Sequence, residues 1–249
     1  MHLCTDNSCI LLSSAYLAPV HYYTKIYQCA VSGAPVIEER ADHYVKQTYR
    51  NRCIIAGDDG PIALTIPVSA PATLPDPSTS SGQVPHTLAI SKTPMHAVLL
   101  SDHGNWRHQH WQAIVSAYRS TPYFDYYADD FERIFHNDTK LLVDFNAALR
   151  DLVLDCLDLH PCITVNTELY LDARQKRGTS TEREGGKAFD FRETIRPKIH
   201  YSFDPHFCPV PYYQVFAQRH GFLPNMSIID LLFNMGPESR IVLRNSCSS

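Results

Sequence analysis

The chain has 249 residues, of which 44% are hydrophobic and 19% are charged, a composition ordinary for a globular protein with a buried core. Its net charge of -4 at pH 7 and its pI near 6.3 argue against nucleic acid as a partner, because a polyanion would not be attracted. A local basic patch remains compatible with a small anionic ligand. We expect one domain over residues 1–249.

No targeting segment or membrane span is expected. The uncharged run from Ile10 to Val20 has no basic segment before it and is too short to cross a bilayer as a helix. The eight cysteines lack CxxC spacing, which favours reduced thiols in the cytoplasm over a disulfide framework or a zinc site. They are Cys4, Cys9, Cys29, Cys53, Cys156, Cys162, Cys208 and Cys247.

The first elements read as strand, helix and strand. Residues Cys9 to Leu17 form an apolar run that predicts a buried strand, bounded by Pro19. The next segment, His21 to Ala30, predicts a helix with Tyr22, Ile26 and Cys29 on one face, and Pro35 to Glu39 predicts a second strand. This order is typical of a parallel α/β unit.

A hairpin and an insertion follow. The apolar segments Arg52 to Ala56 and Ile62 to Val68 flank Gly57-Asp58-Asp59-Gly60, a strong turn signal, and predict a β-hairpin. Residues Ser69 to Pro85 are dominated by Pro, Ser, Thr and Ala. Such a segment buries too little apolar surface to offset its ordering entropy, so we expect a flexible, exposed insertion at 69–85.

The middle of the chain predicts two long helices, Trp106 to Tyr118 and Asp138 to Leu159. The residues between them, Tyr118, Pro122, Tyr123 and Phe124, read as an aromatic cluster at a helix exit that packs in the core. Residues Arg174 to Lys187 mix cations with Gly, Ser and Thr and predict an exposed loop. The fold class predicted is α/β, with a mostly parallel N-terminal sheet flanked by helices and a mainly helical second half.

Near the end of the chain, Ser227-Ile228-Ile229-Asp230 fits a capping box that starts a helix from Ile228 to Met235, stopped by Gly236-Pro237. Asn225, directly before that cap, is the better ligand candidate. Its amide offers a donor and an acceptor at the positive end of a helix.

Three cations lie close together at Lys46, Arg50 and Arg52, with Asn51 between them. If Arg50 and Arg52 lie on an extended segment, their guanidinium groups share one face and suit a carboxylate or phosphate. The alternative is a solvated strand edge protected by charge. We expect replacement of either arginine by lysine to weaken anion binding with little effect on stability. The same choice applies to Arg192, Arg196 and Lys198.

The histidines around the two tryptophans and the cysteine after Arg52 are expected to have structural roles. His103, His108 and His110 lie around two tryptophans without a metal-binding frame, so we expect surface or packing histidines and no metal site. Cys53 is predicted to be a buried strand cysteine, because alternation places it opposite Arg52. The turn from Tyr16 to Tyr22 loosely resembles the HxGH-type nucleotide loop of nucleotidyltransferases, but lacks its glycine and second histidine.

A longer set of residues carries a more specific resemblance. It comprises Tyr16, Pro19, Tyr22, Tyr23, Glu38 or Glu39, Tyr44, Lys46, Asn51, Arg52, Trp106, Ile114, Tyr118, Pro122, Asn146, Gln214, Phe222, Pro224, Asn225, Ser227 and Asp230. Together, and in this order, they resemble the WbqC-like family of bacterial proteins. The chain departs from the family at Ser14-Ala15, where Gln-Pro is typical, and at His21, where the family has glycine.

The resemblance implies a role in O-antigen or other surface-polysaccharide biosynthesis, with transfer of glycine or a similar small acyl group to an amino sugar or nucleotide sugar. The alternatives are a non-catalytic ligand-binding or scaffold protein of that pathway, or a nucleotidyltransferase-like enzyme. The partner expected is a small anionic molecule such as a nucleotide sugar. The cofactor is unknown.

The site predicted is one cleft built from both ends of the chain. Its catalytic candidates are His21, Lys46 and Asn51, and its ligand-binding candidates are Tyr16, Arg50, Arg52 and Asn225. Strand ends and helix starts are both places where an anion is favoured.

Overall fold

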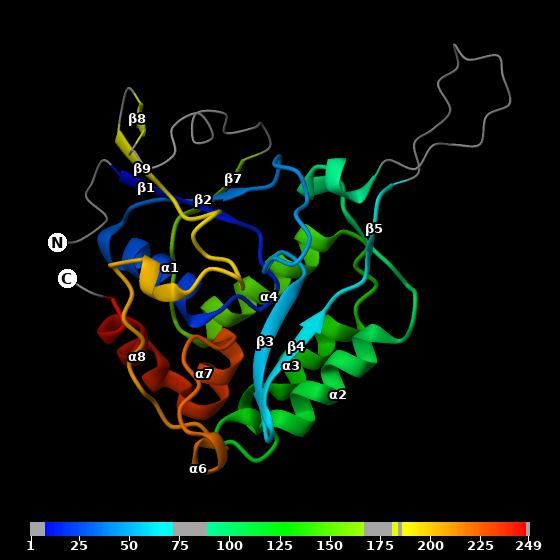
Figure 1. Cartoon of the computed structure of the whole chain (residues 1–249), viewed down its shortest axis with the longest axis vertical. Helices are drawn as coiled ribbons and strands as arrows, with labels where there is room; N and C mark the ends of the chain where they lie inside the picture. Colours follow the sequence, from blue (N-terminus) through cyan, green and yellow to red (C-terminus); the bar gives the residue numbers. More distant parts are fainter. Residues whose placement is uncertain (1–7, 72–88, 167–180, 184–185, 248–249) are drawn as a thin grey trace, which may run out of the picture.

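A computed structural model describes residues 8–71, 89–166, 181–183 and 186–247. A five-stranded sheet in the order β7-β2-β1-β9-β8 dominates one side of the protein (Figure 1). Strands β7, β2, β1 and β9 are parallel, and β8 pairs antiparallel with β9. The strands are β1 (Ser8–Ser13), β2 (Val36–Glu39), β7 (Ile163–Asn166), β8 (Thr181–Arg183) and β9 (Gly186–Asp190).

Strand β1 lies at the centre of the sheet because both of its faces are apolar. Ile10, Leu11 and Leu12 are all buried, as expected of a parallel strand that is covered on both sides. Helix α1 (Val20–Ser32) follows and ends at Gly33, whose φ of 76° supplies the left-handed C-terminal residue. The predicted strand, helix and strand are therefore confirmed, although β1 ends at Ser13.

The helices gather below the sheet, together with a β-hairpin (Figure 1). Helix α7 is buried on every side and packs against α1, α2, α3, α4 and α8, so it forms the centre of the second half. The hairpin is β3 (Arg52–Gly57) and β4 (Gly60–Thr65), and short β5 (Val68–Ser69) pairs with β6 (Leu99–Leu100). The helices are α2 (Trp106–Tyr118), α3 (Phe124–His136), α4 (Leu142–Cys156), α6 (Ala217–His220), α7 (Ile228–Met235) and α8 (Ser239–Asn245).

Short 3-10 turns complete the described structure at Ile90–Lys92, Met95–Ala97, Tyr201–Phe203 and Gly236–Glu238. No helix of the described residues has the length and apolar character needed to cross a bilayer.

The predicted fold class is confirmed, with two corrections. The residues from Arg174 to Lys187 were predicted to be a loop, but Thr181–Arg183 and the start of Gly186–Asp190 are strands. Thr181–Arg183 is polar and Gly186–Asp190 is mixed, so neither shows a strand pattern of its own; β9 is instead positioned by its pairing with the apolar β1. The rest of that segment, and most of the insertion predicted at 69–85, lie outside the described residues.

The helix predicted from Asp138 to Leu159 is shorter, because the residues before it are used for sheet pairing. The carbonyl of Lys140 accepts from Leu100 of β6, and Leu141 forms an isolated bridge with Leu99. The aromatic cluster after α2 is not only a helix exit: Phe124 begins α3, a helix that the sequence analysis missed.

The predicted capping box at Ser227 is wrong, although α7 has the predicted bounds. The Ser227 hydroxyl donates to the carbonyl of Leu17 at 2.7 Å, and its N–H donates to Ile54 at 2.7 Å. The Asp230 carboxylate accepts instead from Tyr212 at 2.6 Å. The side chains of Ser227 and Asp230 are both buried, and each bonds a residue of another segment instead of an N–H group at the start of α7.

Ser227→Ala is expected to lower the free energy of unfolding by about 1–2 kcal/mol, because the carbonyl of Leu17 loses its buried donor. Urea denaturation followed by circular dichroism measures the change. Ser120→Ala, at an exposed position after α2, is the control and should have almost no effect. Equal stability of the two variants would contradict the structural role given to Ser227.

Candidate functional site

A small, narrow pocket lies at the carboxyl ends of β1 and β9. Its walls come from residues 12–15 at the end of β1, residues 48–50 in the turn before β3, Tyr22 of α1, and Phe191, Arg192 and Ile195 after β9. Three parts of the chain that are far apart in the sequence therefore meet around one small space.

The sheet topology makes this position significant. From β1 the chain passes through α1 to β2 on one side, whereas β9 pairs with β1 on the other side. Ligands of open parallel sheets bind outside the carboxyl ends of the strands, at the point where the strand order changes direction. The pocket lies at that switch point.

Arg50 is the most informative group in the pocket wall. Its side chain is only 2% exposed, and one Nη donates to the carboxylate of Asp42. The backbone around it is fixed as well, since its carbonyl accepts from Asn146 Nδ2 at 2.9 Å. The Nε–H of Arg50 has no partner. A buried guanidinium that lines a pocket with an unpaired N–H is suited to an oxyanion.

Arg192 lines the same pocket and is held by two carboxylates. Its Nε and Nη2 form a fork with Asp190, at 3.0 and 2.8 Å, and its Nη1 lies 3.3 Å from Glu39 Oε2. Burial alone would lower the pKa of Arg192, but the bonds to Asp190 and the carboxylates of Glu39 and Asp42 outweigh it and raise the pKa. Arg192 is therefore charged and rigid.

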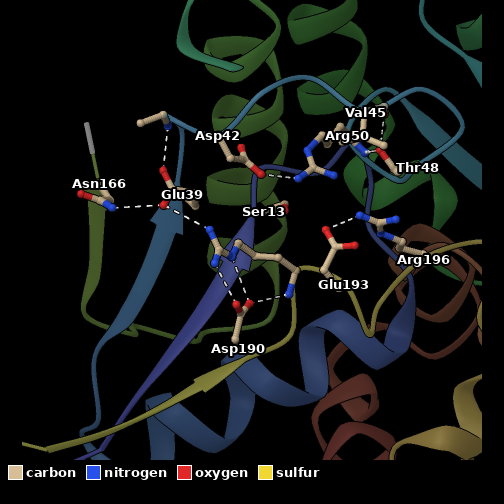
Figure 2. A network of polar contacts seen from close by, with 12 residues as sticks. Ser13, Glu39, Asp42, Val45, Thr48, Arg50, Asn166, Asp190, Glu193 and Arg196 are labelled. Carbon is tan, nitrogen blue, oxygen red and sulfur yellow. Dashed lines mark hydrogen bonds and ion pairs between the residues drawn. The ribbon is translucent and has the colours of Figure 1, made fainter. Parts of the chain in front are cut away.

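More unpaired polar atoms lie close to the same strand end. Figure 2 shows Arg50, Arg196 and Glu193 around the end of β1, where Ser13 lies. The Oγ of Ser13 and the Nε of Arg196 are buried without a hydrogen-bond partner, although Arg196 also pairs with Glu193. The region therefore has unpaired donors on Arg50 and Arg196, and also unpaired acceptor oxygens on Asp42 and Asn146.

The start of α1, by contrast, is closed to an anion. The N–H of Val20 donates to Met226 at 3.0 Å, and that of His21 donates to the side chain of Asn225 at 3.0 Å. The N–H of Tyr22 is bonded within the turn. A helix start binds phosphate through free N–H groups, so this one lacks what an HxGH-type loop requires. The geometry weighs against the nucleotidyltransferase-like alternative.

Tyr16 lies behind the pocket wall rather than in it. It is fully buried, and its hydroxyl lies 3.0 Å from Nδ1 of His110. Burial raises the pKa of Tyr16 and of the neighbouring Cys53 thiol, and lowers the pKa of His110 to about 4. Neutral groups enclosed in this way pack the core, and the prediction that Cys53 is a buried strand cysteine is confirmed.

His21 belongs to a buried charged cluster on the other side of α1. Its Nε2 lies 2.7 Å from Asp204, its ring stacks on Phe207, and Lys25 Nζ lies 2.6 Å from the same Asp204 oxygen. Burial lowers the pKa of His21, although the bond to Asp204 opposes this. For Asp204, burial is outweighed by its bonds to His21 and Lys25, which hold its pKa far below the ordinary range.

The remaining candidates do not line the pocket. Lys46 is exposed. Asn51 donates to the carbonyl of Ile66 at 2.8 Å, and Arg52 donates to Thr65 of the paired strand at 3.0 Å.

The structure therefore corrects the predicted composite cleft. Arg50 lies in a turn before β3, so it does not share a strand face with Arg52, and its burial contradicts the expectation of an exposed cation. Asn225 caps α1 instead of presenting its amide at the start of α7. Both ends of the chain do meet, since His21 and Asn225 are bonded, but only Arg50 of the predicted site residues lines the pocket.

The histidines named as surface or packing residues are placed as follows. His103 and His108 are exposed, and His110 packs against Tyr16. Among the described residues, no group of three or more His, Cys, Asp or Glu side chains is arranged to hold a metal ion.

Residues 14–242 match the model of the WbqC-like protein family. The chain belongs to this family. No curated protein and no solved structure matches the chain. In this WbqC-like protein the matched span includes all of the pocket except the end of β1 at Leu12 and Ser13.

Several polar positions that suggested the WbqC-like family have structural roles around the pocket. Asn146 on α4 donates to Ser14 Oγ at 3.2 Å and to the carbonyl of Arg50, and thereby joins two pocket walls. Gln214 donates to Asp230 at 2.7 Å and accepts from the N–H of Leu223 at 2.8 Å. Asn146 therefore holds two turns that shape the pocket, whereas Gln214 fixes the segment before α7, which does not line it.

Sequence reasoning missed the partners of the pocket arginines. Asp42 and Asp190 lie in segments with no motif, and Ser13 was read only as part of a strand. A usable signal exists at Asp190 to Arg192, where an acid and a base flank one apolar residue and can form a local fork. That signal identifies a pair, but only the pairing of β9 with β1 places it at a site.

Proposed function

We propose that this WbqC-like protein is a transferase that attaches a small acyl group, glycine or similar, to an amino sugar or nucleotide sugar during surface-polysaccharide biosynthesis in the cytoplasm. The anionic part of one substrate binds at Arg50. The observation that carries the binding step is the unpaired Nε–H of a charged side chain that is 2% exposed and lines a pocket.

The pocket supports a small group rather than a large one. Next to the guanidinium, Leu12, Phe191 and Ile195 provide an apolar surface that suits an acyl chain of few atoms. The reaction class itself rests on the family resemblance.

One observation favours the alternative, a non-catalytic ligand-binding or scaffold protein. Of the described residues that line the pocket, none is a cysteine, a histidine or a carboxylate. The lining does have hydroxyl groups, such as that of Ser13, but no described side chain that could act as their base lines the pocket, and Cys53 and His21 are buried elsewhere. A transferase would form a product as purified protein, whereas a ligand-binding or scaffold protein would not.

Arg50→Lys is expected to weaken binding of a small anion about tenfold, because lysine keeps the charge but loses the planar fork. Isothermal titration with acetate and with inorganic phosphate as probes measures the effect. Arg52→Lys is the matched control, since Arg52 bonds Thr65 on the hairpin.

Because Arg50 is buried, its replacement also affects folding, so melting temperatures accompany each titration. Arg192→Lys provides a second test within the pocket, and here too affinity should fall. Unchanged affinity in both pocket variants would overturn the binding site.

The transferase activity is tested in two steps. A strain that lacks the gene should accumulate an unmodified nucleotide sugar, and wild-type protein but not Arg50→Lys should remove it. Purified protein incubated with that accumulated compound and a soluble extract of small metabolites should then increase its mass by one small acyl group. If the strain that lacks the gene accumulates no unmodified nucleotide sugar, the pathway role is wrong. If the purified protein binds the compound but does not increase its mass, the non-catalytic alternative is favoured.

A further inference from the structure

The pocket at the ends of β1 and β9 is closed around Arg50. It has room for about one water molecule. The unpaired Nε of Arg50 is buried, so no solute reaches it in this conformation. Because protein interiors are close-packed, a ligand can reach Arg50 only after part of the pocket wall has moved.

Two of the walls are held from several directions. Strand β1 lies between β2 and β9 in the sheet, and Tyr22 of α1 donates to the carbonyl of Ser13 at 3.0 Å. The turn that carries Arg50 is bonded through its backbone to Asn146 and through its guanidinium to Asp42. Moving either wall would break the sheet or a buried polar network.

The third wall begins a segment that is bonded mainly to itself. We call residues 193–203 the strap. Of its eleven residues only Ile195 is buried, and Ile195 lines the pocket. The hydrogen bonds and the ion pair described for the strap join residues within it or next to it, such as Ile195 to Phe191, Ile199 to Arg196, Phe203 to His200 and Arg196 to Glu193.

Both ends of the strap are fixed by buried ion pairs. Arg192, directly before it, pairs with Asp190 at 2.8 Å, and Asp204, directly after it, pairs with Lys25 at 2.6 Å. A segment between two such anchors can move while its ends stay in place, as lids of many binding sites do. Figure 2 shows the start of the strap next to Arg50 at the end of β1.

The closed position of the strap leaves polar groups without partners. The Nε of Arg196 in the strap is buried and unpaired, and so are the Oγ of Ser13 and the Nε of Arg50 at the pocket. Opening would let water bond these atoms, and it would expose mainly one apolar side chain, that of Ile195. The strap should therefore open at a smaller cost in free energy than the core.

We propose that the strap opens and closes as a unit between Arg192 and Asp204, and that it controls access to Arg50. When the strap opens, Ile195 leaves the wall and the pocket gains the space of a branched side chain. When it closes over a bound group, it excludes water from the site. The proposal rests on the proposed function, in which Arg50 binds the substrate anion, and adds that only the open fraction of molecules can bind it.

The first test measures the motion without any ligand, by hydrogen exchange of the native protein followed residue by residue with NMR. The N–H groups of Ile195 and Phe191 both donate to carbonyls at 3.0 Å, and the two residues are 8% and 7% exposed. Phe191 lies before the first anchor and should exchange with the core. The protection factor of Ile195 is expected to be about tenfold lower than that of Phe191. Equal protection of the two would overturn the proposal.

The second test measures access to Arg50. Phenylglyoxal modifies arginine side chains, and mass spectrometry of peptides gives the rate at each position. Pro197→Gly makes the strap more flexible without changing a residue that lines the pocket. It is expected to speed modification of Arg50 about threefold and to lower the protection of Ile195 by the same factor.

Pro122→Gly, at an exposed position between α2 and α3, is the matched control and should change neither quantity. Melting temperatures show that both variants are folded. Equal effects of the two variants, or faster exchange at Ile195 without faster modification of Arg50, would mean that the strap does not control access, and the proposal would be wrong. If the strap passes both tests but Arg50→Lys binds anions as the wild type does, the strap stands and the anion site of the proposed function fails.

Discussion

Asp204→Ala is expected to lower the free energy of unfolding by about 3–5 kcal/mol. The carboxylate accepts from His21 and Lys25, and the Lys25 side chain is 0% exposed. Removing Asp204 leaves the ammonium buried without the carboxylate that faces it, which costs far more than an ordinary surface pair. Urea denaturation followed by tryptophan fluorescence measures the loss.

Two comparisons separate this effect from simple loss of packing. Asp130→Ala removes the exposed ion pair with Arg133 on α3 and is expected to cost less than about 1 kcal/mol. The double variant Lys25→Met with Asp204→Ala should recover much of the lost stability, because the buried charge is gone. A cost for Asp204→Ala as small as that of Asp130→Ala would contradict the role of the cluster.

The same cluster makes the protein sensitive to acid. The folded-state pKa of Asp204 is depressed, so its contribution is present above the unfolded value of about 4 and is lost as the pH falls through the folded value.

Asp230→Asn is expected to remove a pH dependence of opposite sign. Burial raises the pKa of Asp230 to about 6, although bonds from Tyr212 and Gln214 oppose it. In the unfolded chain the pKa is about 4. The folded state therefore holds the proton more tightly, and stability falls as the pH rises from about 4 to about 6, by about 2–3 kcal/mol in total.

The measurement is the free energy of unfolding across pH 4 to 7 in wild type and in Asp230→Asn. Because other groups titrate equally in both proteins, the difference between the two curves isolates Asp230. The difference should change within this window and be constant above it. Asp129→Asn, at an exposed position on α3, should give a constant difference throughout. A constant difference for Asp230→Asn as well would show that its carboxyl titrates normally.

Regular elements were predictable where one local pattern dominates. Helix α2 has the predicted bounds, and the β3–β4 hairpin forms around the predicted Asp58-Asp59 turn. Strand β9 was missed because its residues show no strand pattern of their own and it gains its apolar neighbours from β1, far away in the sequence. The predicted capping box is wrong for a related reason. At this buried helix start, the Ser227 hydroxyl donates to the carbonyl of Leu17 and not to a group of its own helix.

The site was predictable in residue type but not in arrangement. Arg50 was identified as a cation suited to an oxyanion, and it lines the pocket. Its burial and its partner Asp42 follow from the turn between β2 and β3, which no spacing rule describes. Arg192 reaches the pocket because β9 joins β1, so its contribution depends on sheet order and not on its neighbours in sequence.

The entry to α1 has a consequence for the order of folding. Leu17 has a φ of 40° and a carbonyl bonded to Ser227, and the next turn is tied to Asn225 and Met226, about two hundred positions later. Strand β1 likewise pairs with β9, which is synthesised much later. During synthesis the N-terminal segment thus leaves the ribosome long before its partners exist. Such long-range closure is expected to slow folding, and the pocket cannot be complete before β9 has paired with β1.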